Sequence, residues 1–243
     1  MEEGMSMANI ALILAGGAGT RMKQDIPKQF LTVNERPILI YTLEAFQNHP
    51  LIDEIAVVCI EAWEPIFWSY VNQFNVTKVK YVVSGGENRQ ESIQNGLNEL
   101  EKHHSPDDIV LIHDAIRPLV SSHIISDAIR VAEKYGSAVP AVRCTSAIAM
   151  TDDGIVSRGS YPREQLREIQ NPHTFRLGEI ADVYRRAAKE GIRDSVSSFT
   201  LKIQMGEQVH FSDGSPTNIK LTVVEDIDRF KALLTLQRSG WLK

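Results

Sequence analysis

The 243-residue sequence has few of the features that mark membrane, secreted, metal-cluster or nucleic-acid-binding proteins. Its two cysteines are too few for a disulfide framework or a thiolate metal cluster, and such usage is typical of a reducing compartment. No apolar run approaches the roughly 18 residues of a membrane span. The net charge of -5 argues against general nucleic-acid binding, which usually needs a basic excess. We therefore expect a cytoplasmic protein with neither a membrane nor a nucleic acid as partner.

The amino terminus also lacks a secretory signal, because it is acidic and has no apolar segment. Met5 and Met7 are further possible starts, so we interpret residues 1–7 as either a tag remnant or an upstream start. The remaining residues, 8–243, are long enough for a single large α/β domain, and no repeat or linker divides them.

Two common nucleotide-binding motifs are missing too, although a glycine loop follows the first apolar run. Residues 10–14 predict a buried strand, and the loop after it has neither the Gly-Lys-Ser/Thr of a P-loop nor the third glycine of a G-x-G-x-x-G fingerprint. The loop does contain Gly16, Gly17 and Gly19, followed by Arg21 and Lys28. Glycine amides can converge on an anion, and both cations suit phosphate oxygens. The stretch therefore predicts a polyphosphate site.

After this loop strands and helices alternate, which predicts an α/β fold with a doubly wound, mostly parallel sheet. Further buried strands are expected at residues 55–60, 79–83, 109–112 and 137–142, with a short one at 209–211. Helical spacing is found at residues 38–48, 63–74, 89–102, 121–135, 177–190 and 224–237. Residues 191–195 predict one more helix start, with Asp194 as its N-cap.

Two strand ends carry residues suited to chemistry, and ligands of such sheets bind at strand ends. The third strand is followed by a second glycine pair, Gly85-Gly86, and the fourth by His113-Asp114. Mg²⁺ typically takes one or two carboxylates plus substrate phosphates, so Asp114 is a candidate magnesium ligand. The alternative is that Asp114 caps the next turn and pairs with Arg117. We interpret His113 as a hydrogen-bonded structural residue rather than a general base.

A different pattern interrupts the alternation in the second half of the chain. Residues 144–150 and 155–158 flank Asp152-Asp153-Gly154, which is a hairpin signal. An isolated two-stranded hairpin is only marginally stable in water, so another subunit is a natural partner for it. Polar-rich segments follow at residues 161–166 and 169–175.

Four motifs, spread over nearly the whole chain, together resemble one enzyme family. They are L-A-G-G-x-G-T-R-M with P-K-Q-F-L, then G-G-E-x-R-x-x-S, H-D-A-x-R-P and N-I-K-L-T-x-x-E-D. The set is similar to that of the cytidylyltransferases acting on 2-C-methyl-D-erythritol 4-phosphate, and of their relatives acting on D-ribitol 5-phosphate. The resemblance implies a Rossmann-like nucleotidyltransferase fold, CTP as co-substrate, Mg²⁺, and transfer of CMP to an alditol phosphate. It also implies a homodimer, formed through a protruding β-hairpin arm at about residues 141–165.

The resemblance implies roles for individual residues. The triphosphate would lie against Ala15, Gly16, Gly17, Gly19, Thr20, Arg21 and Lys28. Cytosine and ribose would lie near Gly86, Glu87, Arg89 and Ser92, with Ala115 also on the CTP side. Asp114 would lie near the metal, and Lys220 near the α-phosphate, so that Arg21, Lys28 and Lys220 are the expected catalytic residues. Arg117 and, from the partner subunit, Thr145 and Arg163 would contact the acceptor phosphate.

Departures from the family pattern all fall in the acceptor half. They are Cys144 for Asp, Ala147 for Lys, Pro162 for Asp, Asn171-Pro172-His173 for Thr-Pro-Gln, and Arg193-Asp194 for Thr-Asp. Arg193, with Asp194 beside it, would either add a positive contact to the acceptor phosphate or simply be exposed. The acceptor therefore stays open between ribitol 5-phosphate, for wall or capsular polymers, and methylerythritol phosphate, for isoprenoid precursors.

Two other functions compete with this one. A sugar-1-phosphate nucleotidylyltransferase using UTP or dTTP shares the glycine-Arg-Lys loop, but the second and third motifs argue against it. A non-catalytic nucleotide-binding regulator would not need the full set of Arg21, Lys28, Asp114 and Lys220.

Overall fold

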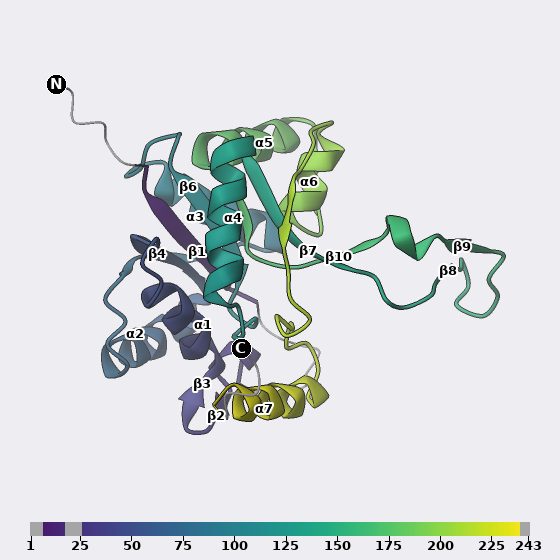
Figure 1. Cartoon of the computed structure of the whole chain (residues 1–243). Helices are drawn as coiled ribbons and strands as arrows, with labels where there is room; N and C mark the ends of the chain where they lie inside the picture. Colours follow the sequence, from purple (N-terminus) through teal and green to yellow (C-terminus); the bar gives the residue numbers. More distant parts are fainter. Residues whose placement is uncertain (1–6, 18–25, 239–243) are drawn as a thin grey trace.

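The computed structural model describes residues 7–17 and 26–238, and an eight-stranded sheet forms its centre (Figure 1). The strands of this sheet are β1 (Asn9–Ala15), β4 (Glu54–Cys59), β5 (Val79–Ser84), β6 (Ile109–Asp114), β7 (Ser137–Arg143), β10 (Arg167–Ile169), β11 (His173–Arg176) and β12 (Phe211–Asp213). Their order is β10-β7-β11-β6-β1-β4-β5, and β12 pairs with β7. The predicted short strand at residues 209–211 thus begins two residues later.

The predicted parallel core of the sheet is confirmed, and two strands of the sheet, β10 and β11, were not predicted. Strands β6, β1, β4 and β5 pair in parallel. Between β6 and β7 lies β11, antiparallel to both. It falls in the segment for which only polar character was noted, because His173 and Thr174 interrupt its apolar pattern. Both residues are nevertheless buried, at 4% and 0% exposure.

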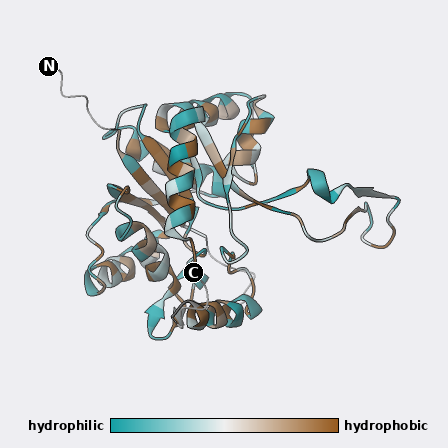
Figure 2. Ribbon diagram, viewed as in Figure 1, coloured by the Kyte–Doolittle hydropathy of each residue, from teal (hydrophilic) through white to brown (hydrophobic). Residues whose placement is uncertain are grey.

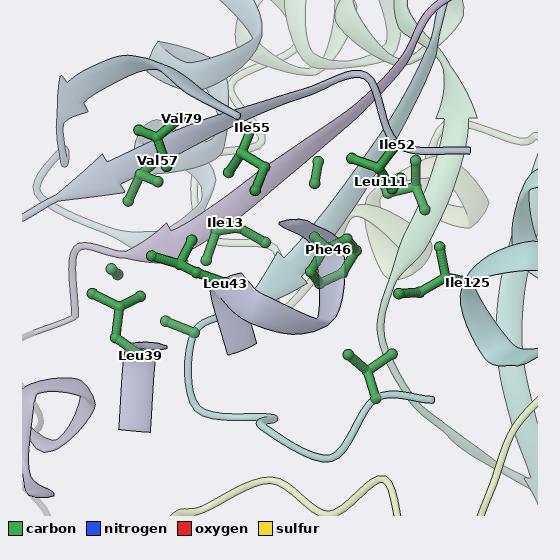
Figure 3. Packing of buried hydrophobic residues seen from close by; sticks show 14 of the residues in the cluster. Ile13, Leu39, Leu43, Phe46, Ile52, Ile55, Val57, Val79, Leu111 and Ile125 are labelled. Carbon is green, nitrogen blue, oxygen red and sulfur yellow. The ribbon is translucent and has the colours of Figure 1, made fainter. Parts of the chain in front are cut away.

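Helices cover both faces of the sheet, as a doubly wound fold requires (Figure 1). Helices α1 (Ile38–Gln47), α2 (Glu64–Gln73) and α4 (Ser122–Tyr135) pack on one face, and α3 (Arg89–Leu100), α5 (Leu177–Lys189) and α6 (Ser198–Gln204) on the other. Ile13 of β1 lies in the first cluster and Leu12 in the second, because neighbouring residues of a strand point to opposite faces. Figure 3 shows Ile13 beside Leu43 and Phe46 of α1. Within the described residues, no helix is long and apolar enough to cross a membrane.

A smaller unit lies at one edge of the molecule, beside the carboxyl ends of the strands (Figure 1). It consists of η2 (Lys28–Phe30), β2 (Thr32–Val33), β3 (Arg36–Pro37) and the last helix, α7 (Glu225–Arg238), while η3 (Glu61–Trp63) precedes α2. Val33 and Phe230 share a cluster with Ile116, which follows β6, and with Leu221, which follows Lys220. This packing brings the segments that carry Lys28, Asp114 and Lys220 to the same edge of the sheet.

The predicted hairpin exists, but its second strand was placed wrongly. Strand β8 (Ile148–Met150) pairs antiparallel with β9 (Gly159–Tyr161), and η4 (Arg163–Gln165) follows. Residues 155–158 belong to the turn instead, because the Asp153 carboxylate accepts hydrogen bonds from the amides of Ile155 and Val156 and bends the chain there. The whole arm protrudes from the body of the molecule between β7 and β10 (Figure 1).

The predicted helix start at residues 191–195 is also wrong. Helix α6 begins at Ser198, and its N-cap is Ser197, whose hydroxyl accepts a hydrogen bond from the amide of Thr200. Ser and Asp are both good N-caps, and only the path of the chain after α5 decides between Ser197 and Asp194.

Candidate active site

A cavity of about 820 Å³ opens at the carboxyl ends of β1, β5 and β6. Its volume falls within the range of small-molecule sites. Many of the predicted site residues line it, namely Gly16, Gly17, Lys28, Gly86, Glu87, Arg89, Ser92, Asp114, Arg117 and Lys220. Residues distant in sequence therefore meet around one cavity, as the four motifs suggested.

The two glycine loops pack directly against each other. A Cβ atom added to Gly16 would lie 3.4 Å from the Cα of Gly85, so the backbones approach closely. The side-chain amide of Gln29 donates hydrogen bonds to the carbonyl oxygens of Ala15, at 2.6 Å, and Gly17, at 3.1 Å. Gln29 lines the cavity and was not among the predicted site residues, although it stands in the Pro-Lys-Gln motif. It ties the short helix that carries Lys28 to the first glycine loop.

The second glycine loop is held in shape by the start of α3. The amide of Gly86 donates to the Ser92 hydroxyl at 3.0 Å, and the Asn88 side chain caps the helix by accepting from the Glu91 amide at 2.9 Å. A Cβ on Gly86 would collide with the Glu91 side chain. Asn88 lines the cavity and was missed, although an Asn three residues before a Glu is a recognisable helix-start signal.

Asp114 forms the charged centre of the cavity. Its side chain is only 4% exposed, with one carboxylate oxygen 2.7 Å from Arg89 Nη1 and the other 2.8 Å from Lys220 Nζ. Burial acts to raise the pKa of this carboxyl, but the charges of Arg89 and Lys220 outweigh burial and hold it well below its usual range. Asp114 is therefore ionised, and its ion-pair partners are Arg89 and Lys220 rather than Arg117.

Two buried histidines flank this centre and stay neutral. Burial lowers the pKa of His113 to about 4, and its Nε2 lies 3.0 Å from the carbonyl oxygen of Arg117. The prediction of a structural, hydrogen-bonded His113 is thus confirmed. Burial, together with the nearby charge of Arg89, lowers the pKa of His173 to about 3. His173 lines the cavity, so it presents a neutral ring to a ligand.

A polar network joins the acceptor-side motif to the segment before Lys220. The Asn218 side chain donates to the carbonyl oxygen of Asn171 at 2.8 Å, and Arg117 Nη1 donates to the carbonyl oxygen of Asn218 at 2.7 Å. The Gln170 amide exchanges hydrogen bonds with the backbone of Ser215. These contacts position Arg117 and Lys220 relative to each other. Neither Gln170 nor Asn218 was among the predicted site residues.

Residues at the start of α6 complete the wall of the cavity. The lining includes Val196, Ser197, Phe199 and Thr200. Arg193 and Asp194 are exposed and outside that lining, so their contact with an acceptor stays a prediction. The four wall residues were missed because the predicted helix start was placed too early in the sequence.

Other predicted residues lie away from the cavity or outside the described part. Ala15 and Ala115 are buried, at 1% exposure each, and do not line it. Thr145 and Arg163 are exposed on the arm, where Arg163 pairs weakly with Glu164 at 3.4 Å. Gly19, Thr20 and Arg21 lie outside the described residues.

The donor set decides what kind of metal site the cavity can offer. In residues 7–17 and 26–238 no group of three histidine, cysteine or carboxylate side chains could hold a metal ion. Asp114 supplies the buried carboxylate of the cavity lining, and Glu87 supplies an exposed one. One carboxylate beside several cations fits a Mg²⁺ ion that is held mainly by substrate phosphates.

Comparisons with known proteins agree with this geometry. The family model described as 2-C-methyl-D-erythritol 4-phosphate cytidylyltransferase matches residues 9–236. A ribitol-5-phosphate cytidylyltransferase of Lacticaseibacillus paracasei is 41% identical over 92% of this chain and 97% of its own length. A 2-C-methyl-D-erythritol 4-phosphate cytidylyltransferase of Clostridium acetobutylicum is 38% identical over 93% and 97%. Among solved structures, 4-diphosphocytidyl-2C-methyl-D-erythritol synthase from Anaerococcus prevotii superimposes with a TM-score of 0.79, at 25% identity over 94% and 99%.

Proposed function

Because the chain belongs to the 2-C-methyl-D-erythritol 4-phosphate cytidylyltransferase family, we propose that it transfers CMP from CTP to an alditol phosphate, with D-ribitol 5-phosphate as the acceptor. It is accordingly a nucleotidyltransferase. We assign the activity to a single domain, residues 8–243, which the match over residues 9–236 supports. The cytoplasmic location remains a prediction.

One observation carries the proposal: four cationic side chains and two glycine loops line the same cavity. Lys28, Arg89, Arg117 and Lys220 all contribute to it. The reaction brings a triphosphate and a phosphate monoester together, and two anions approach only where fixed positive charge offsets their repulsion. A cavity with this lining suits such a pair better than it suits a neutral substrate.

The reaction needs no covalent intermediate with the protein. A phosphate oxygen of the acceptor attacks the α-phosphorus of CTP in line, and the bond to the bridging oxygen of the β-phosphate breaks. Pyrophosphate leaves with that electron pair, and CMP is now joined to the acceptor. The side chains contribute by positioning and charge neutralisation. Lys28 would bind the triphosphate, Lys220 the α-phosphate and Arg117 the acceptor phosphate.

A magnesium ion belongs to this proposal as a partner of the triphosphate. When bound, Mg²⁺ neutralises phosphate charge, and Asp114 would hold it directly or through water. We expect a chelator to abolish turnover and added Mg²⁺ to restore it.

The protruding arm belongs to the proposal as a dimerisation element. It exposes apolar side chains well separated from the body, with Ile155 at 86%, Val156 at 55% and Tyr161 at 52% exposure. Exposed apolar groups gathered in one segment are typical of an interaction surface. In a homodimer built through the arms, Thr145 and Arg163 would reach the partner's cavity and contact the acceptor phosphate there.

Pyrophosphate release tests the proposed reaction. The purified protein is incubated with CTP and Mg²⁺ and, in separate reactions, ribitol 5-phosphate, 2-C-methyl-D-erythritol 4-phosphate or glucose 1-phosphate. We expect rapid release with ribitol 5-phosphate and little with UTP in place of CTP. Preference for methylerythritol phosphate would assign the second acceptor, which the relative from Clostridium acetobutylicum supports. Release with glucose 1-phosphate alone would contradict the proposal.

A further inference from the structure

Arg89 makes a contact that its motif did not suggest. The resemblance put it beside cytosine and ribose, yet its guanidinium lies 2.7 Å from Asp114, joining the first residue of α3 to the last residue of β6. Lys220 Nζ lies 2.8 Å from the other carboxylate oxygen. Asp114 therefore has two counter-ions, one at each oxygen.

The two counter-ions are held in different ways. Arg89 follows the N-cap of a twelve-residue helix, and its planar guanidinium forms directional bonds with a carboxylate. Lys220 carries its ammonium at the end of a flexible stem, in a loop between Asn218 and the start of α7. Both side chains are about one-third exposed, at 32% and 33%, and both line the cavity. Lys220 is therefore the counter-ion that can turn toward a ligand.

A transfer of Lys220 from Asp114 to a ligand requires that Asp114 keep another counter-ion. A carboxylate exposed to only 4% is strongly destabilised when it loses all of its charge partners. With Arg89 in place, Lys220 can leave without that penalty. Without Arg89, Lys220 would be the single cation in direct contact with the carboxylate and would be held there.

We propose that Arg89 is the fixed counter-ion of Asp114 and that it thereby frees Lys220 to bind a substrate phosphate. Arg89 is thus a positioning residue that acts through Asp114 and Lys220, and it does not read the nucleoside. The inference rests on the proposed function in one respect only, the assignment of Lys220 to a phosphate group.

Anion binding tests the proposal without requiring turnover. Calorimetry in magnesium-free buffer with a chelator compares CTP and inorganic tripolyphosphate, which lacks the nucleoside. Arg89→Gln should weaken both ligands by the same factor, about tenfold, the effect of losing one charge-assisted contact. Arg89→Lys keeps the positive charge and should stay within about threefold of the wild-type protein. Arg185→Gln is the matched control, because it removes an ion pair with Glu101 at the other end of α3, outside the cavity.

The same measurement in Asp114→Asn protein shows whether Arg89 acts through Asp114. With the carboxylate charge removed, Lys220 is free in either case, so adding Arg89→Gln should change binding by less than about twofold.

Several outcomes would overturn the proposal. Weaker binding of CTP alone would mean that Arg89 contacts the nucleoside, and a full tenfold loss on the Asp114→Asn background would mean that Arg89 binds phosphate itself. Unchanged binding in Arg89→Gln, or no binding of either ligand to the wild-type protein, would contradict it as well. Pyrophosphate release by the wild-type protein is scored separately, so a failure of the proposed reaction is distinguishable from a failure of this inference.

Discussion

The centre of the cavity and the protruding arm differ in how deeply their residues are buried and in how far apart in the sequence their contacts lie. At the centre, His113 is 0% and Asp114 3% exposed, and the ion-pair partners of Asp114 come from elements far apart in the sequence. On the arm, Ile155 is 86% exposed, and the hydrogen bonds of its turn join residues within a few positions of one another. Figure 2 likewise shows hydrophobic residues concentrated in the sheet and its covering helices, whereas the arm is mixed. The centre is buried by segments of its own chain, whereas the arm exposes apolar side chains away from the body.

The largest effect is expected when a cationic side chain of the cavity is removed. Lys28→Ala should lower the rate of cytidylyl transfer by roughly two to three orders of magnitude, the scale for losing one preorganised donor to a developing charge. Arg21→Ala should do the same. Steady-state pyrophosphate release measures the loss, and Lys231→Ala, at an exposed position of α7, is the control. Near wild-type turnover in Lys28→Ala would contradict its catalytic role.

A change on the arm should leave the centre intact. Ile155→Asp puts a charge into the proposed interface, so the dimer should dissociate at least about tenfold more readily because a buried unpaired charge is unfavourable. The rate at low acceptor concentration should fall with it, whereas CTP affinity should be unchanged. Sedimentation measures the dimer and calorimetry the CTP affinity, with Leu51→Asp as a control at an exposed apolar residue outside the arm. A dimer of wild-type strength in Ile155→Asp would remove the arm from the interface.

A third variant tests how the centre is held together. Asn218→Ala leaves the buried carbonyl oxygen of Asn171 without its donor, which should cost about 1–3 kcal/mol in the free energy of unfolding. Because Asn218 also lies between the segments of Arg117 and Lys220, turnover should fall too. Urea denaturation measures the stability, and Asn95→Ala, whose hydrogen bond to Ser84 is exposed, is the control. Equal stability of the two variants would argue against the network.

The smallest expected effect is a pH dependence of the stability that comes from His173, beside the centre of the cavity. The pKa of His173 is about 3 in the folded protein, below the ordinary 6.5, so the unfolded chain binds more protons below pH 6.5. The contribution of His173 to the free energy of unfolding is therefore fully present above pH 6.5 and is lost as the pH falls toward 3. Between pH 7 and 5.5 the loss should be about 1 kcal/mol for this histidine. In His173→Gln the loss of stability between pH 7 and 5.5 should be smaller by that amount, as measured by urea denaturation at both pH values. An unaltered pH dependence would contradict the low pKa of His173.

Much of the site was predictable because local patterns identify it. The run at residues 10–14, the glycines after it and the His-Asp pair at the end of β6 are all short-range signals, and parallel strands bring their carboxyl ends to one edge. The ion pair between Arg89 and Asp114 was not predictable in the same way. Arg89 belongs to a motif associated with the nucleoside, and only the packing of α3 against the sheet turns it toward β6.

The elements that were predicted wrongly or missed share one cause. Strand β11, the N-cap at Ser197 and the late start of β9 depend on long-range pairing or on one side-chain hydrogen bond chosen among several equally suitable residues. Local preference does not distinguish Ser197 from Asp194, or residues 155–158 from 159–161. Tertiary contacts supply the difference.

By itself, the sequence determined the α/β class, the alternation that makes the sheet core parallel, the two glycine loops and the family, because each depends on residue types at fixed spacing. Only the tertiary structure decided that Arg89 and Lys220 share Asp114, that Gln170 and Asn171 bond to the segment before Lys220, and that residues around the start of α6 line the cavity. Those contacts join positions many residues apart, and their geometry follows from how the whole chain packs.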